Sequence, residues 1–355
     1  MKTNENDRLL ELDSLRAIAA LAVLFYHYTG GYEHIVAPHI QPVPCVEFGY
    51  VGVDLFFVIS GFVIAWTLRR STSLVDFAIG RFARLYPAYL AGAFITGIVI
   101  FGFGFNPKHV QTSDVAWNAV IGLPQLVNAK NLDASYWTLG VEVSFYIMAA
   151  LFVSGLPKVR FEIFCLIWLS ASLAVRLLLP GHIRLQLLLA SNYSALFVAG
   201  AMLFALSPPM RPDRLTFVTF AAAIAMFFIG GYPGWLRPVS GAGLCLFVGL
   251  VFGASAGRLA FLTFRPLVVI GQASYSLYLI HQIVGYWIIS NFERLGVPPL
   301  AAIAAATTIV IPAAIGLRKA VEVPAQRLIR NAAWAHLIGG RADLTEVPKS
   351  GGRAG

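Results

Sequence analysis

Residues 50–68 read YVGVDLFFVISGFVIAWTL, a run of 19 positions that holds one charged side chain, Asp54. An α-helix rises 1.5 Å per residue, so this run is about 28 Å long and matches the hydrocarbon core of a bilayer, which is about 30 Å thick. Arg69 and Arg70 follow the run directly, as basic anchors at its end. The stretch therefore predicts a membrane-spanning helix.

Comparable apolar stretches recur along the 355 residues of the chain. Charged residues make up 12% of it, against about 25% in soluble domains, and apolar types make up 58%. This composition excludes a soluble multidomain protein, a disordered chain, a coiled coil and a disulfide scaffold. In lipid the backbone must satisfy its own hydrogen bonds, and the stretches are too long for barrel strands. We therefore predict an all-α integral membrane protein, a bundle of about ten transmembrane helices at residues 9–28, 50–68, 80–105, 138–155, 160–179, 191–206, 214–229, 237–254, 273–291 and 299–318.

The predicted spans form one transmembrane domain, residues 1–330. Residues 331–355 have no apolar period, so we expect a disordered cytoplasmic tail there. The first apolar run lacks a small-residue cleavage site and is expected to be a retained span rather than a signal peptide. The chain has three cysteines whose wide spacing suggests neither a disulfide framework nor a metal cluster: Cys45, Cys165 and Cys245.

Basic residues are distributed unevenly between the predicted loops. If the N-terminus is cytoplasmic, 19 of the 26 Lys and Arg residues fall on the cytoplasmic side and 6 on the outer side. The positive-inside rule then predicts that both termini are cytoplasmic. The net charge of +9 is explained by these loops, so we expect the lipid bilayer as a partner and no nucleic acid.

The first predicted span carries Arg16 and, near its other end, His27. They are 11 positions apart, which is about 20° past three full turns and about 16 Å along a helix. Both therefore lie on one face, with Arg16 in the inner half and His27 at the outer end. Ionisable residues within spans are costly and are functional candidates. The alternative interpretation is that Arg16 snorkels inward and His27 is an interfacial residue.

Two acidic residues, Asp54 and Glu142, come early in spans that run from outside to inside. Together with His27 they are predicted at one depth near the outer face. A histidine beside carboxylates is an arrangement for general-base catalysis. We therefore predict His27 as the base and Glu142 and Asp54 as the groups that orient it. The alternative is three independent interfacial residues at helix ends.

A pair of arginines, Arg81 and Arg84, opens the third predicted span from the cytoplasmic side. Residues three apart are neighbours on a helix, and paired guanidinium groups grip phosphate oxygens bidentately. The alternative is plain positive-inside anchoring, but Pro87 follows closely and favours a shaped site. With Arg16 between this pair and His27, the layout suits a phosphate-bearing donor that enters from the cytoplasm.

The ninth predicted span holds Ser274 and His281, seven positions apart and hence on one face. Seven residues span about 10 Å of helix, so the two cannot form a hydrogen-bonded nucleophilic pair. We predict His281 as a pocket residue or as a residue that bridges two helices.

The ordered motifs in these spans resemble acyltransferase family 3, membrane proteins that O-acylate cell-surface carbohydrates in bacteria. The resemblance covers residues 12–282. It rests on five motifs, namely Arg16-x10-His27, the run GVDLFFVISGF from Gly52, Arg81-x2-Arg84-x2-Pro87, Trp137-Thr138-Leu139-x2-Glu142-x2-Phe145-Tyr146, and Ser274-Tyr275-x2-Tyr278-Leu279-x-His281.

This resemblance implies ten spans, an acyl-CoA donor, usually acetyl-CoA, and a carbohydrate acceptor that is exposed on the cell surface or linked to lipid. It also implies that His27 and Arg16 are required. No metal and no bound cofactor are expected, and the implied location is the bacterial inner membrane. The site residues that follow are His27, Glu142 and Asp54 for catalysis, Arg16, Arg81 and Arg84 for acyl-CoA, and Trp137, Tyr146, Ser274, Tyr275 and His281 for the pocket.

Three points stay open at the level of sequence. His27 could take a proton from the acceptor hydroxyl, or it could carry the acyl group transiently. The same intramembrane residues could form the substrate or proton path of a secondary transporter, although no inverted repeat or pair of broken helices supports this. A third interpretation is a non-catalytic scaffold in a polysaccharide-modifying complex, but it would leave the arginine pair and His27 without a role.

Overall fold

The computed structural model describes residues 9–71, 73–155, 159–230 and 236–342, and within these ranges every regular element is a helix. The long helices are α1 (Leu10–Tyr26), α3 (Gly52–Arg70), α4 (Leu74–Gly97), α7 (Trp137–Gly155), α8 (Phe161–Leu178), α10 (Ser194–Leu206), α11 (Arg214–Gly230), α12 (Leu236–Ser255), α14 (Ser274–Arg294), α15 (Pro299–Leu317) and α16 (Val323–Ala342). Short helices are α2 (Tyr32–Ile35), α5 (Thr112–Trp117), α6 (Leu123–Val127), α9 (Ile183–Leu188) and α13 (Arg265–Gln272). Short π or 3₁₀ turns are η2 (His27–Gly31), η3 (Glu47–Val51), η4 (Ile98–Gly102), η5 (Ala134–Tyr136), η6 (Ala260–Leu262) and η7 (Arg318–Glu322).

Five helical segments are long and apolar enough to cross a membrane: Glu47–Arg70, Leu74–Gly102, Ala134–Val153, Phe161–Leu178 and Pro299–Ala333. The pair α13 and α14 meets at 73° and makes a sixth if it is counted as one span. The all-helical fold is thus confirmed for the described residues, and a multi-pass membrane protein is supported. The other four predicted spans fall on α1, α10, α11 and α12, which are not among these candidate spans, so the count of ten stays a prediction.

Two boundaries differ from those expected. Helix α4 begins at Leu74, because Ser73 caps it by accepting a hydrogen bond from the amide of Asp76 at 3.1 Å. Arg81 and Arg84 therefore lie well inside the helix rather than at its mouth. At the other end of the chain α16 continues to Ala342, so residues 331–342 are helical where a disordered tail was expected. Residues 343–355 lie outside the described part.

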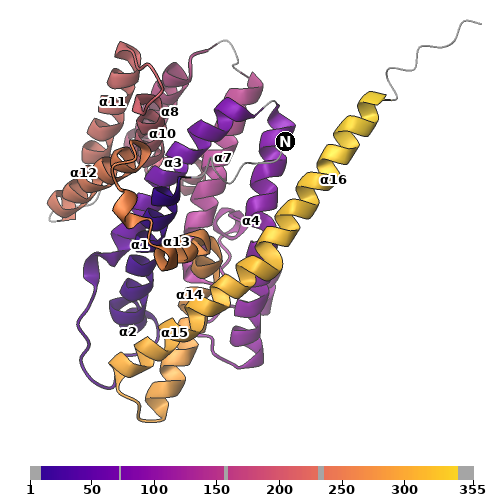
Figure 1. The fold of residues 1–355 in the computed structure, drawn as a ribbon. Coiled ribbons are helices and arrows are strands. Elements are labelled where there is room, and N and C mark those ends of the chain that lie inside the picture. Colours follow the sequence, from indigo (N-terminus) through magenta and orange to yellow (C-terminus); the bar gives the residue numbers. More distant parts are fainter. Residues whose placement is uncertain (1–8, 72, 156–158, 231–235, 343–355) are drawn as a thin grey trace, which may run out of the picture.

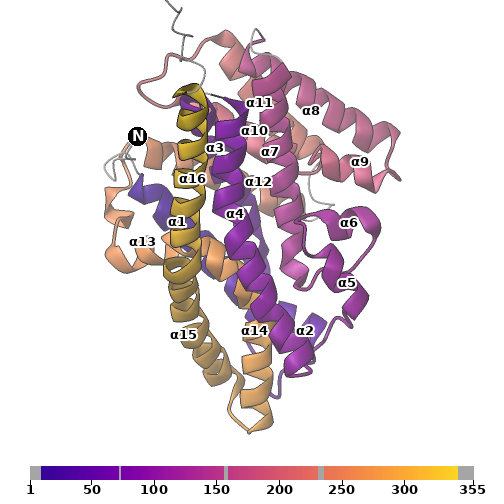
Figure 2. The ribbon, with the colours of Figure 1, turned by 90° about the vertical axis from the view of Figure 1, so that its right-hand side faces the viewer.

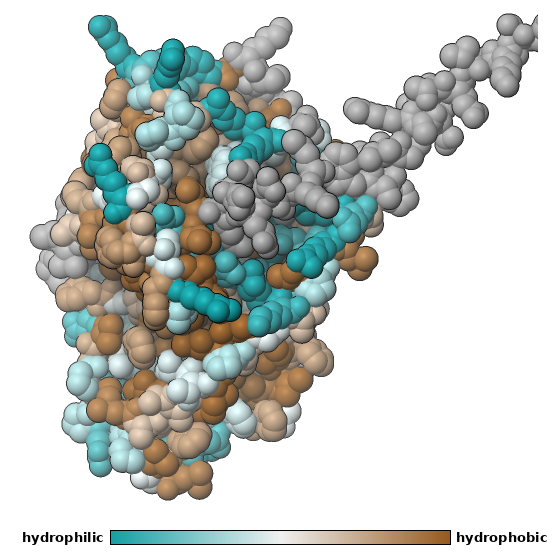
Figure 3. All heavy atoms as spheres, in the orientation of Figure 1, coloured by the Kyte–Doolittle hydropathy of each residue, from teal (hydrophilic) through white to brown (hydrophobic). Residues whose placement is uncertain are grey.

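The long helices lie side by side, and α16 runs obliquely away from the bundle (Figure 1). The view turned by 90° shows α4 and α7 beside one another, with α15 and α14 at the opposite end of the bundle from α8 and α11 (Figure 2). Hydrophobic residues cover much of the flank, while hydrophilic residues gather at the upper end and along α16 (Figure 3). This distribution suits an apolar flank in lipid and a polar end in water.

Two hydrophobic clusters form the core. One lies around α3, α7, α8, α10, α11 and α12, and the other lies around α4, α14 and α15. Helix α1 contributes buried residues to both clusters, and Phe56 and Tyr275 pack against both. The two cores meet along α1, and the polar site described below lies at this seam.

Helices α3 and α10 approach closely because each presents a glycine to the backbone of the other. A Cβ atom at Gly200 would overlap the carbonyl of Val58, and one at Gly61 would overlap the carbonyl of Phe197. Small residues at helix contacts are how membrane helices bring their backbones together.

Replacing Gly200 by alanine is therefore expected to destabilise the fold. The added methyl meets backbone that cannot move aside, and such overpacking costs about 1–3 kcal/mol. The free energy of unfolding in mixed detergent micelles measures this loss. Gly249→Ala in α12 is the matched control, because nothing lies within 4 Å of its added Cβ. Equal stability of the two variants would contradict the close packing.

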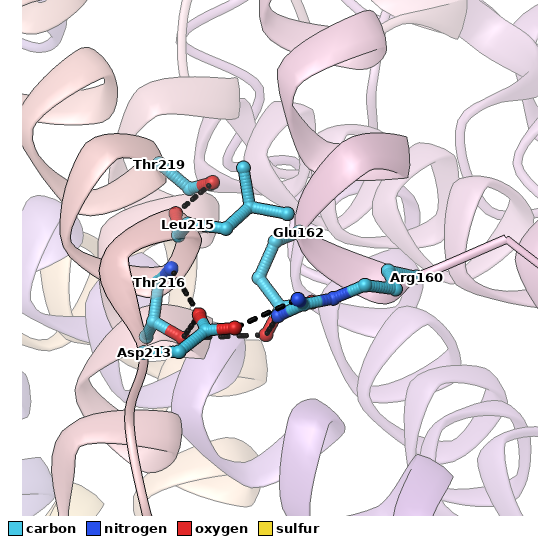
Figure 4. A network of polar contacts seen from close by, with 6 residues as sticks. All are labelled: Arg160, Glu162, Asp213, Leu215, Thr216 and Thr219. Carbon is cyan, nitrogen blue, oxygen red and sulfur yellow. Dashed lines mark hydrogen bonds and ion pairs between the residues drawn. The ribbon is translucent and has the colours of Figure 1, made fainter.

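One end of the bundle collects basic residues from several loops, among them Arg69, Arg160 and Arg211, and we name it the basic end. Here Arg160 pairs with Asp213 at 2.7 Å and with Glu162 at 3.3 Å, and Asp213 accepts the amide of Thr216 at 3.1 Å (Figure 4). The Arg160 guanidinium beside Asp213 holds the pKa of that carboxyl well below its usual range. This network joins the starts of α8 and α11.

A hollow of about 640 Å³ opens beside this network, and Arg69 and Arg211 line it. The segments predicted to be cytoplasmic around residues 69, 160 and 211 therefore do meet at one end of the molecule, as alternating spans require.

Candidate active site

Two histidines from distant parts of the sequence meet at the centre of the site. His27 begins η2, directly after α1, and His281 lies in α14. The Nδ1 atom of His27 lies 3.0 Å from the Nε2 atom of His281, and the ring centroids are 4.9 Å apart. His281 is buried, while His27 keeps some exposure. His281 is thus the helix-bridging residue that the sequence suggested.

The carbonyl of Tyr278 decides where the protons of this neutral pair lie. It is 2.8 Å from Nδ1 of His281, and a carbonyl can only accept, so this nitrogen carries the hydrogen. Nε2 of His281 then has a lone pair and accepts from Nδ1 of His27. The remaining nitrogen of His27, Nε2, is left with a lone pair. This is the form of histidine that can take a proton from a substrate.

A break in the first helix places His27. The helix changes to a π turn at this residue, and Thr29 has non-helical dihedral angles of −103° and −107°. The Thr29 hydroxyl donates to the carbonyl of Phe25 at 2.7 Å and accepts from the amide of Val46 at 3.1 Å. Single π turns inside helices often mark functional sites. The turn is therefore held by its own hydroxyl and by the loop that follows.

Tyr28 connects the histidine pair to a second buried histidine. Its hydroxyl donates to the carbonyl of His281 at 3.0 Å, and its own carbonyl lies 3.1 Å from Nε2 of His39. The other ring nitrogen of His39 lies 2.5 Å from the carboxylate of Glu293, and the ring stacks on Tyr32. Sequence reasoning did not single out His39 or Glu293. The sequence shows His39 only as a histidine in a predicted loop, and its spacing does not distinguish it from a surface residue.

A cavity of about 80 Å³ lies between α1, α3, α4, α7 and α14, on the side of the histidine pair that faces the basic end. The Tyr278 ring lines it and lies 5.4 Å from the ring of His281. Its other polar lining residues include Arg16, Ser60, Arg84, Thr138 and Glu142. Ser274 and Tyr275, predicted for the pocket, also line it.

The charges around this cavity are mixed. The carboxylates of Glu322, Glu142 and Asp13 stabilise the positive charge of Arg84 electrostatically. Asp13 also pairs with Arg16 at 3.5 Å. Each of the two glutamates is held by hydroxyl groups, Glu142 by Tyr146 and by Ser60 at 3.3 Å, and Glu322 by Ser276 at 2.7 Å. Arg84 therefore sits in a compensated ionic network.

Arg81 differs from Arg84. Its guanidinium lies over the rings of Tyr146 at 5.7 Å and Phe77 at 6.0 Å, and it does not line the cavity. Its Nε–H is buried and has no hydrogen-bond partner among the described residues. A buried, unused donor on a cation is costly to leave unpaired, and an anionic ligand would satisfy it.

A comparison with protein families matches the chain to the acyltransferase domain over residues 9–318. The chain belongs to acyltransferase family 3. Both histidines, all three arginines and the cavity lie within the matched acyltransferase domain. Glu322 and the whole of α16 lie beyond its end.

Named relatives of this acyltransferase domain occur in several bacteria. It is 27% identical over 321 residues to peptidoglycan O-acetyltransferase OatA of Listeria monocytogenes, covering 76% of this chain and 48% of that protein. It is 25% identical over 334 residues to O-acetyltransferase OatA of Staphylococcus aureus, covering 81% and 52%. Acyltransferase MdmB of Streptomyces mycarofaciens is 26% identical over 193 residues, covering 50% and 47%. The chain spans about half the length of these relatives, and no solved structure matched it.

The acyltransferase domain does not group all predicted catalytic residues together. The hydrogen-bond partner of His27 is His281, where the sequence predicted Glu142 and Asp54. Glu142 lines the arginine cavity instead, because it lies seven residues, or about two turns, after Ser135 of η5, which contacts Gln282 next to His281. Asp54 is buried and does not line the cavity.

Three predicted pocket residues also lie elsewhere in the acyltransferase domain: His281, which is paired with His27, and Trp137 and Tyr146. Trp137 is 37% exposed and packs against the ring of Tyr193 at 5.4 Å. Tyr146 is buried behind the cavity, where its hydroxyl donates to Glu142. Trp137 is thus next to a pocket-lining pair, Thr138 and Leu139, without lining the pocket itself. The described residues contain no group of three or more His, Cys, Asp or Glu that could hold a metal ion.

Sequence reasoning also missed Asp133 of the acyltransferase domain, which precedes η5 and is buried. It accepts hydrogen bonds from the amide and hydroxyl of Ser135 at 2.8 and 2.7 Å, and from the amide of Ile283 at 3.1 Å. Burial raises the pKa of the Asp133 carboxyl to about 6. The available signal was an acid four residues before Trp137, at the position that caps a helix.

Proposed function

We propose that the chain is a membrane O-acyltransferase. It moves an acyl group, most simply acetyl, from acyl-CoA at the cytoplasmic side to a hydroxyl of a cell-surface or lipid-linked carbohydrate. His27 is the general base. The observation that carries the proposal is the histidine pair, whose hydrogen bonds leave Nε2 of His27 with a lone pair. The ring of Tyr278 lies against the ring of His281 and lines the cavity that holds Arg16 and Arg84.

The proposed step is a direct transfer. Nε2 of His27 takes the proton of the acceptor hydroxyl while its oxygen attacks the thioester carbonyl. The C–S bond then breaks, the thiolate of CoA leaves, and the imidazolium of His27 returns its proton to that thiolate. A thioester is already activated, so orientation and proton transfer supply most of what the reaction needs. Arg84, at the cavity wall, is the cation that we assign to stabilise the oxygen that becomes negative.

The donor is proposed from size and charge. A cavity of about 80 Å³ has room for a short acyl group but not for a nucleotide. The thioester end of acyl-CoA would therefore enter the cavity while its phosphates stay nearer the basic end. The unused Nε–H of Arg81 suits a phosphate oxygen there, and Arg16 completes the cationic wall around the donor.

The relatives support the proposed acceptor class, and the distribution of basic residues supports the proposed location. Two of them are O-acetyltransferases, one of which is named for peptidoglycan. A carbohydrate hydroxyl is the acceptor that this comparison favours. We place the protein in the bacterial inner membrane with both termini cytoplasmic, because of the bias of basic residues toward those segments.

The decisive experiment incubates purified protein in detergent with acetyl-CoA labelled in the acetyl group and with cell-envelope glycan. We expect label in the glycan as a base-labile ester, and no label on the protein in the absence of acceptor. Stable label on the protein, chased into glycan when acceptor is added, would replace direct transfer by the acyl-histidine route. No transfer to any glycan hydroxyl would refute the proposed activity.

Arg81→Ala is expected to raise the KM for acyl-CoA by about 10- to 150-fold with little change in kcat. A charged hydrogen bond contributes about 1.5–3 kcal/mol, which corresponds to that range. Arg81→Lys should restore only part of the affinity, because the planar fork is lost. Arg70→Ala, at the exposed end of α3, is the control for loss of a basic residue at the same end. An unchanged KM for Arg81→Ala would mean that Arg81 only helps to set the orientation of the protein in the membrane.

Arg84→Ala is a poorer probe of donor binding. It would leave the carboxylates of Glu142 and Glu322 without their cation, and breaking a buried ionic network by removing one partner costs about 3–5 kcal/mol. Loss of activity in that variant would therefore mix binding with folding.

A further inference from the structure

Asp133 lies at the junction of α7 and α14, and the mechanism above does not use it. None of its surface is exposed. One carboxylate oxygen accepts from Ser135 twice, which is the usual arrangement of a helix-capping acid. The other oxygen accepts the amide of Ile283, 150 positions away in sequence. A capping role accounts for the first set of contacts and leaves the second unexplained.

The contact with Ile283 enters the middle of a helix. In a regular helix the amide of Ile283 bonds the carbonyl of Leu279, four residues earlier. Here that amide also donates to Asp133, and the carbonyl of Leu279 accepts the hydroxyl of Tyr136 at 2.8 Å. The segment 133–136 therefore bonds both backbone groups of one turn of α14. This turn carries His281.

The same segment also holds the side chains on both sides of His281. The amide of Ser135 donates to Gln282 at 2.8 Å, and the carbonyl of Ser135 accepts the hydroxyl of Tyr278 at 2.7 Å. Tyr278 is the residue whose carbonyl fixes the proton of His281. The position of His281 thus depends on a short segment that Asp133 organises.

We propose that Asp133 is a positioning residue for transfer: it fixes the turn of α14 from which His281 orients His27. The inference rests on the proposed function, because it concerns the base of that reaction. Asp133 touches neither donor nor acceptor in this arrangement. It acts on the rate of proton removal and leaves donor affinity unchanged.

Asp133→Asn tests the inference with the smallest change of shape. An amide has one acceptor oxygen and one donor nitrogen, so it cannot accept from both Ser135 and Ile283. One donor loses its partner, and the turn shifts. A misplacement of about 1 Å can cost about 100-fold in rate. We expect kcat to fall by about 30- to 100-fold, with the KM for acyl-CoA within 3-fold of the wild-type value.

The matched control is Asp114→Asn. Asp114 also caps a short outer helix, α5, and accepts backbone amides from Gln111 and Lys130, but it makes no contact with α14 among the described hydrogen bonds. Its variant should keep kcat within 3-fold of the wild-type value. Equal kcat losses in both variants would assign Asp133 to general helix capping and overturn the inference.

A double-mutant cycle with His281→Asn isolates the route of the effect. If Asp133 acts through His281, then adding Asp133→Asn to His281→Asn should lower kcat by less than 3-fold further. Multiplication of the two losses would overturn the inference. Should Asp133→Asn fail to accumulate in membranes, Ser135→Ala takes its place in the cycle. It removes one bond to the carboxylate, and we expect a several-fold loss of kcat that disappears in the His281→Asn background.

Amide hydrogen exchange provides a readout that does not need activity. The peptide that covers residues 278–286 should exchange faster in Asp133→Asn than in wild type, and not in Asp114→Asn. If wild type transfers no acyl group but exchange rises as expected, the proposed function fails while the structural link stands. If wild type is active and Asp133→Asn keeps the wild-type kcat, the inference alone fails.

Discussion

His27→Ala is expected to lower kcat by about 100- to 10,000-fold, which is the range that a general base contributes. The variant removes the nitrogen that accepts the proton of the acceptor hydroxyl. It should still insert and fold, because His27 lies at the end of α1 and is only partly buried. Labelled acetyl transfer measures the loss, and the thermal midpoint in detergent measures folding.

His34→Ala is the matched control for His27. His34 lies seven residues further on, in α2, and is exposed. Its variant should transfer acetyl groups at the wild-type rate. If His27→Ala keeps more than one tenth of the wild-type kcat while folded, His27 is not the base. The arginine cavity would then need a different proton acceptor, and Glu142 is the ionisable residue of its wall that could serve.

His281→Asn is expected to lower kcat by about 100-fold and to leave the KM for acyl-CoA unchanged. The amide nitrogen of asparagine can still donate to the carbonyl of Tyr278, but the side chain is too short to reach His27. Nδ1 of His27 then loses its acceptor, and the ring is free to turn and to change tautomer. In serine proteases, loss of the group that orients the catalytic histidine costs about 10,000-fold, so 100-fold is a conservative expectation for a neutral partner.

The pairing of His27 with His281 also predicts how the two substitutions combine. Residues that act as one unit show losses that do not multiply. The double variant His27→Ala with His281→Asn should therefore be no slower than His27→Ala alone, within 3-fold. Fully multiplied losses would mean that His281 acts on the reaction independently of His27, for example through the cavity wall beside Tyr278.

Much of the architecture was readable from local sequence. The helical class, the ten apolar segments that the structure shows as helices within about six residues, and the common face of Arg16 and His27 follow from apolar run length and from the period of the helix. Helix α16 has no such apolar run and was not predicted. These are properties of neighbouring residues, and lipid allows few alternatives. The five motifs also identified the family, because each is a short local pattern.

The site was readable only in part. Residues predicted from motif positions include several that line the cavity, such as Arg16, Arg84 and Glu142. The prediction that Glu142 orients His27 rested on depth estimated from the order of residues in a span. Depth estimated this way is loose by one or two turns, or about 5–10 Å. That error is larger than the length of a hydrogen bond. The depth estimate therefore could not distinguish a position beside His27 from the position that Glu142 has in the cavity wall near Arg84.

What the sequence by itself determined is where the apolar helices lie and which polar residues interrupt them. Only the tertiary structure decided that His27 meets His281, that Asp133 bonds the amide of Ile283, and that Glu142 belongs with Arg84. The reason is physical. Hydrophobicity and helical period act within one segment, whereas a hydrogen bond between helices depends on which helices adjoin, on their rotation and on their register. Those are fixed by packing contacts such as Gly61 and Gly200, made between residues more than a hundred positions apart.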